Sequence, residues 1–171
     1  MALLRDFIGQ TLQWKRPRFF STDYELRAED QIIATMKHSG VWKRRTIAEA
    51  EGSQWTFRRA GLSGKLHFIY AGALQPAEEP AQPLGSFKRN WHGDGELTIV
   101  DGRSYTWART GTWNPTWSWK DAYSTILLSM KRRRLVEIAP EANDSSDLAL
   151  LTLFGFYLVL VKEAEAAAAA S

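Results

Sequence analysis

Four short clusters of basic residues are the feature of this 171-residue sequence with the clearest potential for chemistry. They are Lys43-Arg44-Arg45, Arg58-Arg59, Lys88-Arg89 and the run from Lys131 to Arg134. On one face of a fold they would attract anionic lipid headgroups, at about 1 kcal/mol for each basic residue near a membrane. Adjacent residues on a strand point to opposite faces, so at most half of each strand cluster can serve one patch. Solvated surface charge is the competing interpretation.

From these clusters we predict a patch that binds an anionic, phosphoinositide-like membrane lipid or, failing that, a protein partner. The residues expected in this patch are Lys43, Arg44, Arg45, Lys131, Arg132, Arg133 and Arg134. Tryptophan beside Arg and Lys could also serve nucleic acid, because aromatic rings stack on bases next to a cationic groove. Packing explains the eight tryptophans more simply, since each buries a large area, so nucleic acid is not the expected partner.

Catalytic and metal-binding motifs are not recognisable in the sequence. It has no cysteine, which removes disulfides, thiolate metal sites and cysteine nucleophiles. His38, His67 and His92 stand apart, each without a second ligand at metal-site spacing. Gly93-Asp94-Gly95 is typical of a turn rather than of a phosphate loop. We therefore expect a non-catalytic protein with no metal and no cofactor; a small-ligand binder or an enzyme with an unrecognised loop site is the alternative.

The first half of the chain has the pattern of short strands joined by tight turns. Tyr24 and Leu26 alternate with polar neighbours, residues 27–30 form a polar turn, and the extended pattern resumes from Ile33 to Lys37. Glycines then recur at intervals suited to hairpins up to Tyr70. This half is expected to be a strand-rich sheet.

The second half is separated by a proline-rich stretch, residues 71–85, which we interpret as a surface connection. Asp101-Gly102 lies between two strand-like segments and predicts a hairpin with a type I′ turn. Trp113, Trp117 and Trp119 share one parity, which would place them on one side of an extended strand. The strand-rich pattern therefore continues beyond the connection.

Two further patterns bear on where the basic residues lie. Residues 125–130 and 135–138 predict a last hairpin whose turn is the basic run 131–134. Residues 52–61 also align with residues 102–111: both glycines, the threonine and the last arginine coincide, and the aromatic positions stay aromatic. This short match could reflect duplication or the same hairpin arising twice.

The uncharged run from Leu148 to Val161 decides the fold. As a helix it spans only about 21 Å, too short for a bilayer core of about 30 Å. It is longer than the usual strand and lacks polar alternation. Asp144 to Asp147 offers N-cap oxygens before it, so we favour a helix. Ala149, Thr152 and Gly155 form a stripe of small residues that would let one wall approach closely.

A helix that is apolar on every side must be surrounded on every side, and only the strands can cover it. We therefore predict a mainly β fold, a closed antiparallel barrel of about twelve strands around a buried helix over about 147–163. Residues 1–17 are expected to be an N-terminal extension, residues 18–163 a single domain, and residues 164–171 a low-complexity tail.

The opening pattern from Tyr24-Glu25-Leu26 to Ile32-Ile33-Ala34 and the run from Asp147 to Tyr157 resemble the tubby C-terminal-like superfamily. This group includes the plant LURP-one-related proteins and the phospholipid scramblases. The resemblance covers roughly Arg18 to Lys162 and implies a twelve-stranded barrel threaded by its last helix. Tubby proteins bind phosphoinositides and scramblases act on membranes. No residue here matches their lipid-binding or calcium-binding positions, so the resemblance implies no site.

The expected location is the cytoplasm, at the periphery of a membrane if the basic patch binds lipid. Residues 1–14 lack the unbroken apolar core and cleavage site of a signal peptide. The net charge of +3, from 22 basic and 19 acidic residues, is too small by itself to indicate a partner. The distribution of those charges in the fold matters more.

Overall fold

The computed structural model describes residues 2–19, 21–38, 45–61, 63–74 and 82–171, which form twelve strands, two short 3₁₀ helices and one α-helix. The first six strands are β1 (Thr11–Lys15), β2 (Asp23–Ala28), β3 (Gln31–His38), β4 (Arg45–Ala50), β5 (Ser53–Ala60) and β6 (Leu66–Ala71). The other six are β7 (Gly85–Arg89), β8 (Gly95–Ile99), β9 (Ser104–Thr110), β10 (Thr116–Lys120), β11 (Ile126–Lys131) and β12 (Leu135–Ile138). The helices are η1 (Leu4–Phe7), η2 (Pro140–Ala142) and α1 (Leu148–Ala169).

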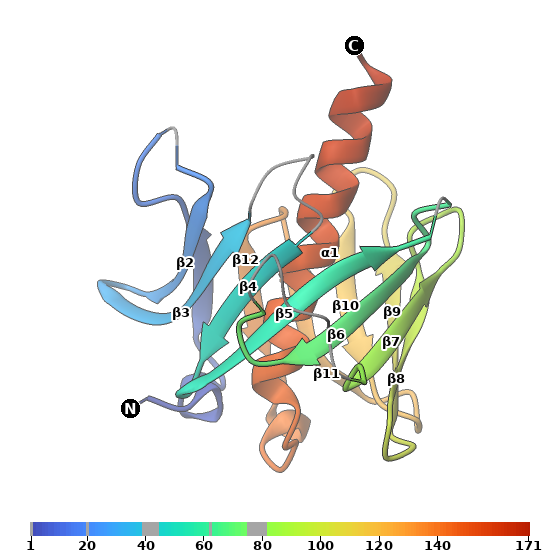
Figure 1. Cartoon of the computed structure of the whole chain (residues 1–171). Helices are drawn as coiled ribbons and strands as arrows, with labels where there is room; N and C mark the ends of the chain where they lie inside the picture. Colours follow the sequence, from blue (N-terminus) through green and yellow to red (C-terminus); the bar gives the residue numbers. More distant parts are fainter. Residues whose placement is uncertain (1, 20, 39–44, 62, 75–81) are drawn as a thin grey trace.

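The strands form one closed antiparallel barrel (Figure 1). Each strand pairs with its neighbour in the sequence, and β1 closes the sheet by pairing with β12 as well as with β2. Alternate side chains of a strand point inward, and the burial of β2 and β4 alternates accordingly. Polar–apolar alternation along the chain thus specifies which face of each strand lines the interior.

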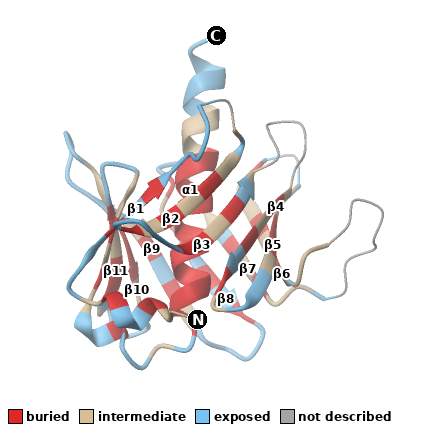
Figure 2. Ribbon diagram, turned by 90° about the vertical axis from the view of Figure 1, so that its left-hand side faces the viewer, coloured by how far each residue is buried: buried red, intermediate tan, exposed pale blue. Residues whose placement is uncertain are grey.

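Helix α1 runs through the barrel, and every residue from Leu148 to Val161 is buried (Figure 2). Phe156 stacks on Trp14 of β1 with ring centroids 4.2 Å apart. A Cβ atom on Gly155 would lie 2.8 Å from Nε1 of Trp119 and 2.9 Å from Cε of Met130. The close wall expected beside the small-residue stripe is therefore present at Gly155. These contacts confirm the predicted fold class, a closed β-barrel around a buried C-terminal helix.

Two boundaries differ from the expected ones. Residues 11–15 were assigned to an N-terminal extension, but they form β1, because Leu12 and Trp14 point into the core between two partner strands. The helix continues to Ala169 instead of ending near residue 163, since alanine and glutamate have high helix propensity and Glu165 also binds arginines of the barrel rim. Most of the expected tail is therefore helical, and the helix is exposed from residue 166 onward.

Two local predictions need correction. The hairpin between β8 and β9 exists, but of Asp101 and Gly102 only Gly102 has a positive φ, 97°, so the turn is not type I′. Trp117 and Trp119 point into the barrel from β10 as expected. Trp113 lies in the loop before that strand and is 95% exposed. Pro115, directly before β10, separates it from the strand.

No helix in the described part of the chain is both long and apolar enough to cross a membrane. Although α1 has 22 residues, its last part contains the half-buried charged residues Lys162, Glu163 and Glu165, followed by exposed alanines. Its apolar part is enclosed by the strands (Figure 2). The apolar surface of the helix therefore belongs to the core.

Candidate functional site: the basic end of the barrel

One end of the barrel collects most of the basic residues of the described chain. Because neighbouring strands are antiparallel, β1, β3, β5, β7, β9 and β11 all end at the rim where α1 leaves the barrel (Figure 1). We call this rim, its connecting loops and the helix beyond Val161 the basic end. Its described basic residues are Lys15, Arg16, Arg18, Lys37, Arg45, Arg58, Arg59, Lys65, Lys88, Arg89, Arg109, Lys131, Arg132, Arg133, Arg134 and Lys162. Its described acidic residues are Asp23, Asp94, Glu96, Glu163 and Glu165.

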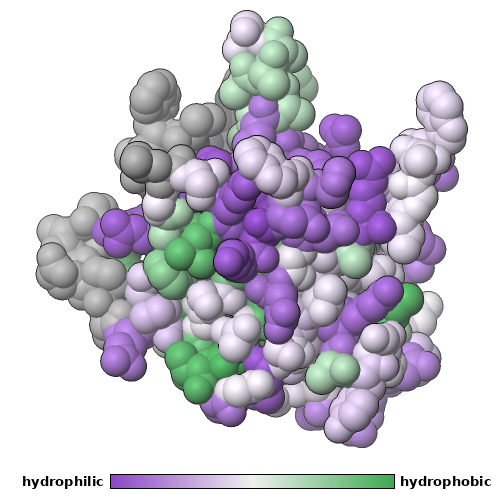
Figure 3. All heavy atoms as spheres, turned by 90° about the vertical axis from the view of Figure 1, so that its right-hand side faces the viewer, coloured by the Kyte–Doolittle hydropathy of each residue, from purple (hydrophilic) through white to green (hydrophobic). Residues whose placement is uncertain are grey.

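The opposite rim, which we call the closed end, has the reverse composition. Its described basic residues are Arg5, Arg27, Arg103 and Lys120. Its described acidic residues are Asp6, Glu29, Asp30, Glu49, Glu51, Asp101, Asp121, Glu141, Asp144 and Asp147. Figure 3 shows hydrophilic side chains gathered on the upper part of one face, below the projecting end of α1. A modest net charge therefore conceals a strong separation of charge along the barrel axis.

Two glutamates of α1 hold part of this basic rim. Glu165 accepts hydrogen bonds from Arg89 at 2.6 and 2.8 Å and from Arg59 at 2.7 Å. Glu163 accepts two from Arg134, at 2.9 and 3.1 Å. Burial alone would raise the pKa of Glu165, but Arg89 and Arg59 outweigh it and lower the pKa below its usual value. The Glu165 carboxylate therefore stays ionised near neutral pH. Through these hydrogen bonds both glutamates tie the rim to the helix.

A buried histidine lies beneath these ion pairs. His67 of β6 has no solvent exposure, and its Nδ1 lies 2.8 Å from the hydroxyl of Tyr157 on α1. Burial, helped by the charges of Arg89 and Arg59, lowers the pKa of His67 to about 3. The imidazole is therefore neutral under physiological conditions, beneath a rim of permanent cations.

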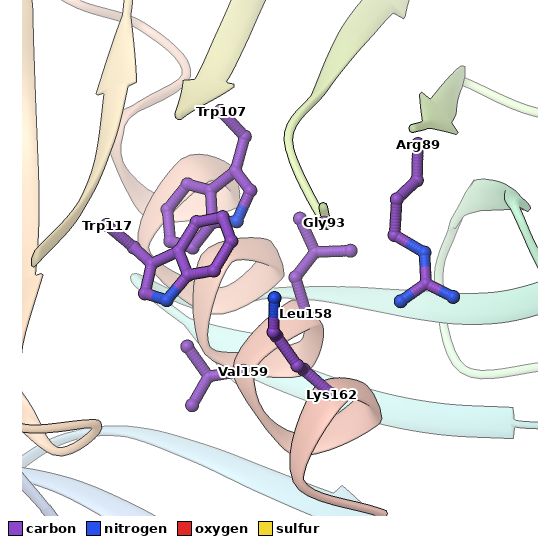
Figure 4. Close-up of a pocket in the computed structure, with 7 residues that line it drawn as sticks. All are labelled: Arg89, Gly93, Trp107, Trp117, Leu158, Val159 and Lys162. Carbon is purple, nitrogen blue, oxygen red and sulfur yellow. The ribbon is translucent and has the colours of Figure 1, made fainter. Parts of the chain in front are cut away.

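The barrel interior beside the helix is filled at this end. The Trp107 and Trp117 rings stack with centroids 5.5 Å apart, and the ammonium of Lys162 lies 4.7 Å from the Trp117 ring centroid (Figure 4). The cavity between them and Gly93 measures only about 10 Å³, about the space of one water molecule. This cavity cannot accept a small organic ligand, which needs several hundred Å³.

A much larger groove opens outside the barrel, between the projecting part of α1 and the loops next to it. Its volume is about 820 Å³. The groove is lined by Arg109, Thr112, Trp113, Pro115, Trp117, Arg132, Arg133, Arg134, Val159, Lys162, Glu163, Ala166 and Ala167. Five of these residues are cationic and one is acidic, so the groove favours an anion.

Three large aromatic side chains protrude from separate loops of the basic end. Phe19 follows β1, Trp91 follows β7 and Trp113 follows β9. They are 86%, 86% and 95% exposed, respectively. The ammonium of Lys65 lies 3.1 Å from the Trp91 ring centroid, a cation–π contact at the surface. Exposed aromatic rings among cations are a feature that core packing does not explain.

The predicted patch is only partly assembled. Arg132, Arg133 and Arg134 all line the groove. Lys131 lies at the same end but forms an ion pair with Glu137 at 2.8 Å and is not part of the groove lining.

The other predicted cluster belongs to a different sector. Arg45 begins β4, also at the basic end, but β3, β2 and β1 separate it from β12. Lys43 and Arg44 lie outside the described residues. The described patch residues therefore share one end of the barrel but divide between two sectors of its rim.

Sequence reasoning missed Arg109, Lys162 and the exposed Trp113 as parts of the groove. The internal repeat held a signal for the first of them, because it aligned Arg109 with Arg59, and both arginines lie at the basic end of their strands. Lys162 could be placed only after the helix was known to leave the barrel at this end.

Comparison with known proteins adds no identity: no family model, curated protein or solved structure matches the chain. Among the described residues, no group of three or more His, Asp or Glu side chains is placed to hold a metal ion. The site is therefore characterised by its charges, its aromatic residues and its groove.

Proposed function

We propose that the basic end of the barrel docks on an anionic membrane surface. The observation that carries this proposal is the gathering of three exposed aromatic residues, Phe19, Trp91 and Trp113, on loops of the same end as the cations. Tryptophan in particular partitions to the interface between headgroups and acyl chains, where its apolar ring and polar N–H are both satisfied. Lys and Arg around it would contact the phosphate groups.

The magnitudes are adequate for reversible docking. Each basic residue near an anionic bilayer contributes about 1 kcal/mol, so a face with half a dozen accessible cations gains about 6 kcal/mol before ordering costs. Burial of an aromatic side chain adds about 1.5–3 kcal/mol. The acidic closed end would be repelled by the same surface, so the separation of charge favours one orientation of the barrel.

The distribution of the aromatic residues favours a membrane over a nucleic acid. Base stacking uses aromatic side chains along a groove that follows the backbone of a strand. Here the three rings come from the β1–β2, β7–β8 and β9–β10 loops, spaced around a rim. Such a ring of projecting loops suits a flat surface.

The proposal extends to location and kinship. A protein that docks in this way would lie in the cytoplasm at the periphery of a membrane, where anionic lipids are exposed. We also propose that the chain is related to the tubby C-terminal-like superfamily. This relation is supported by the twelve-stranded barrel and its buried last helix, which is the architecture that the resemblance implies. Membrane docking itself requires no catalytic group.

Vesicle co-sedimentation tests the docking proposal. The full chain should sediment with phosphatidylcholine vesicles that contain phosphatidylserine, less so as salt is added, and not with phosphatidylcholine alone. The F19A/W91A variant should bind about tenfold more weakly or worse, because it loses two interfacial rings. The matched control is V100A/Y123A, which removes two side chains that are 69% and 89% exposed at the closed end.

Three results would overturn the docking proposal. One is the absence of salt-sensitive binding to the phosphatidylserine vesicles. Another is an equal loss of binding in F19A/W91A and V100A/Y123A. The third is displacement of the vesicles by a single-stranded oligonucleotide that binds more tightly than they do, which would favour nucleic acid as the partner.

A further inference from the structure

The turn between β11 and β12 places two arginines in an unfavourable backbone conformation. Arg132 and Arg133 have φ angles of 49° and 65°, and the N–H of Arg134 donates to the carbonyl of Lys131 at 3.2 Å. The loop has three residues, and Arg132 and Arg133 are the two central residues of its tight turn. Turns with positive φ at both central positions favour Asn-Gly, because a side chain with a Cβ atom costs about 1 kcal/mol or more there. No other turn among the described residues has two consecutive non-glycine residues of this kind.

Stability therefore does not explain why arginine occupies both positions. Their side chains line the groove of about 820 Å³ between this turn and α1. A strained backbone that is retained at the edge of a groove points to a function for its side chains. Asn-Gly would suit the backbone better but has no guanidinium group, so the charged side chains are the property that arginine adds at these two positions.

The charges in the groove are not balanced from within. Its one acidic residue, Glu163, is already bonded to Arg134. The described residues form no ion pair with the four remaining cations, Arg109, Arg132, Arg133 and Lys162. The ammonium of Lys162 donates instead to the carbonyl of His92 at 2.7 Å. Burial, and then the nearby Arg109 and Arg89, lowers the pKa of Lys162, and these effects outweigh the opposing ones of Asp94 and Glu165.

We propose that this groove binds a compound that carries two or more phosphate groups, with Arg132 and Arg133 as its main contacts. Guanidinium groups bind phosphate oxygens in pairs, and several cations around one groove match several phosphates better than a single one. The exposed ring of Trp113 forms one wall and the alanines of α1 another. The inference rests on the proposed function in taking the basic end as the binding face, and it adds one defined site to that face.

Calorimetric titration with inorganic tripolyphosphate tests the site without a membrane. The variant R132N/R133G should bind about a hundredfold more weakly, since two charge-assisted contacts are lost. The same variant should unfold at a higher temperature than the wild type, because it restores the favoured turn residues. A loss of binding with a gain of stability is an outcome that unfolding cannot mimic.

The matched control is R18Q/K88Q, which removes the same charge from the same end but outside the groove lining. It should lower tripolyphosphate affinity only a few-fold. An equal loss in the two variants would show a diffuse electrostatic effect and overturn the inference. Undetectable binding of tripolyphosphate to the wild type would also overturn it.

Vesicles separate the two sources of such a ligand. Cardiolipin carries two phosphates on one headgroup and phosphatidylglycerol carries one, so vesicles of equal charge density can be compared. Preference for cardiolipin that R132N/R133G abolishes would identify a lipid headgroup as the source. Tripolyphosphate binding without that preference would support a soluble ligand. Binding to phosphatidylserine vesicles without tripolyphosphate binding would leave membrane docking intact and reject the groove; the reverse would reject docking and retain the groove.

Discussion

The two ends of the barrel use charge in opposite ways. At the closed end, Asp147 lies just before α1 and is only 8% exposed. Its carboxylate accepts hydrogen bonds from Arg103 and from the hydroxyl of Tyr105, both at 2.6 Å. At the basic end, cations outnumber carboxylates, and the loops project aromatic rings into solvent. The closed end uses its charges to hold the start of the helix. The basic end still has an excess of cations to offer a partner after Glu163 and Glu165 have bound three of its arginines.

The difference between the two ends indicates that the closed end contributes mainly to stability and the basic end mainly to binding. The closed end is covered by η1 and η2, whose Leu4 and Ala142 have no exposed area. The basic end carries self-repulsion and a turn with two consecutive positive-φ arginines, both of which reduce stability, whereas turns of the closed end hold only single non-glycine residues of this kind. Substitutions at the closed end should therefore change stability more than binding, and surface substitutions at the basic end should do the reverse.

The largest expected effect comes from the buried histidine of the basic end. His67 has a pKa of about 3 in the folded protein against 6.5 in an unfolded chain, so the unfolded state binds more protons between these values. Its contribution to stability is complete above about pH 6.5. It falls by up to about 1.4 kcal/mol per pH unit as the pH drops toward 3. The groups around it are Tyr157, Arg59, Arg89 and Glu165.

Urea unfolding of the wild type and of His67→Gln across this pH range measures that effect. The amide of glutamine stays neutral and can still bond to the hydroxyl of Tyr157. The free energy of unfolding should therefore decline less steeply for the variant. Equal slopes for the two proteins would show that His67 is protonated in the folded state and that the basic end tolerates a further buried charge.

The next effect concerns the closed end. Asp147→Ala should lower the free energy of unfolding by about 2–4 kcal/mol, because it leaves the partly buried Tyr105 hydroxyl and Arg103 without their shared acceptor. Binding to phosphatidylserine vesicles should not change. In a Tyr105→Phe background the same substitution should be less destabilising, since the hydroxyl is already gone. A loss of vesicle binding by folded Asp147→Ala would contradict the division of labour between the ends.

An uncharged substitution in the buried middle of α1 serves as a reference for the charged substitutions at the two ends. Gly155→Ala places a methyl group 2.8 Å from the Trp119 ring nitrogen, and overpacking of this kind costs about 1–3 kcal/mol. The higher helix propensity of alanine offsets up to about 1 kcal/mol of that. We expect a modest net loss of stability in urea and unchanged vesicle and tripolyphosphate binding. A gain in stability would show that the wall beside Gly155 can relax.

The fold class could be predicted because a single segment constrained it. The run from Leu148 to Val161 has no polar face, so as a helix it must be buried on all sides. The strands with alternating polar and apolar residues were the only other predicted elements that could surround it. The first strand was missed although Leu12 and Trp14 alternate with polar residues. Five residues are too short a pattern to distinguish a strand from an ordered extension until its partners are known.

The site was less predictable, because it depends on which strand ends meet. Arg132 and Arg133 were identified from composition alone, but their positive φ angles and the groove beside them depend on the register of β11 and β12. Trp113 was assigned to a strand by parity, yet the strand begins three residues later. In a barrel of sequential strands, alternate turns share one end. The basic clusters lie in or next to alternate turns, so their position at one end can be predicted only when every strand between them has been identified correctly.

The smallest effect on stability tests whether the helix itself restrains the basic end. Glu165→Gln removes a charge that binds Arg59 and Arg89, but its side chain is 35% exposed, so the stability loss should stay below about 1 kcal/mol. Vesicle binding should strengthen about fivefold, because one competing carboxylate is lost near the membrane. Asp101→Asn, which removes a more exposed charge from an ion pair with Arg103 at the closed end, should leave vesicle binding unchanged.

The pH dependence of vesicle binding sharpens this last test. Arg89 and Arg59 lower the pKa of Glu165, so the wild type keeps the carboxylate ionised until the pH falls below the ordinary carboxylate range. The advantage of Glu165→Gln should therefore persist at neutral pH and disappear in stronger acid, where the wild type also becomes neutral. Weaker binding by Glu165→Gln at neutral pH would mean that the carboxylate positions the two arginines for the membrane instead of competing with it.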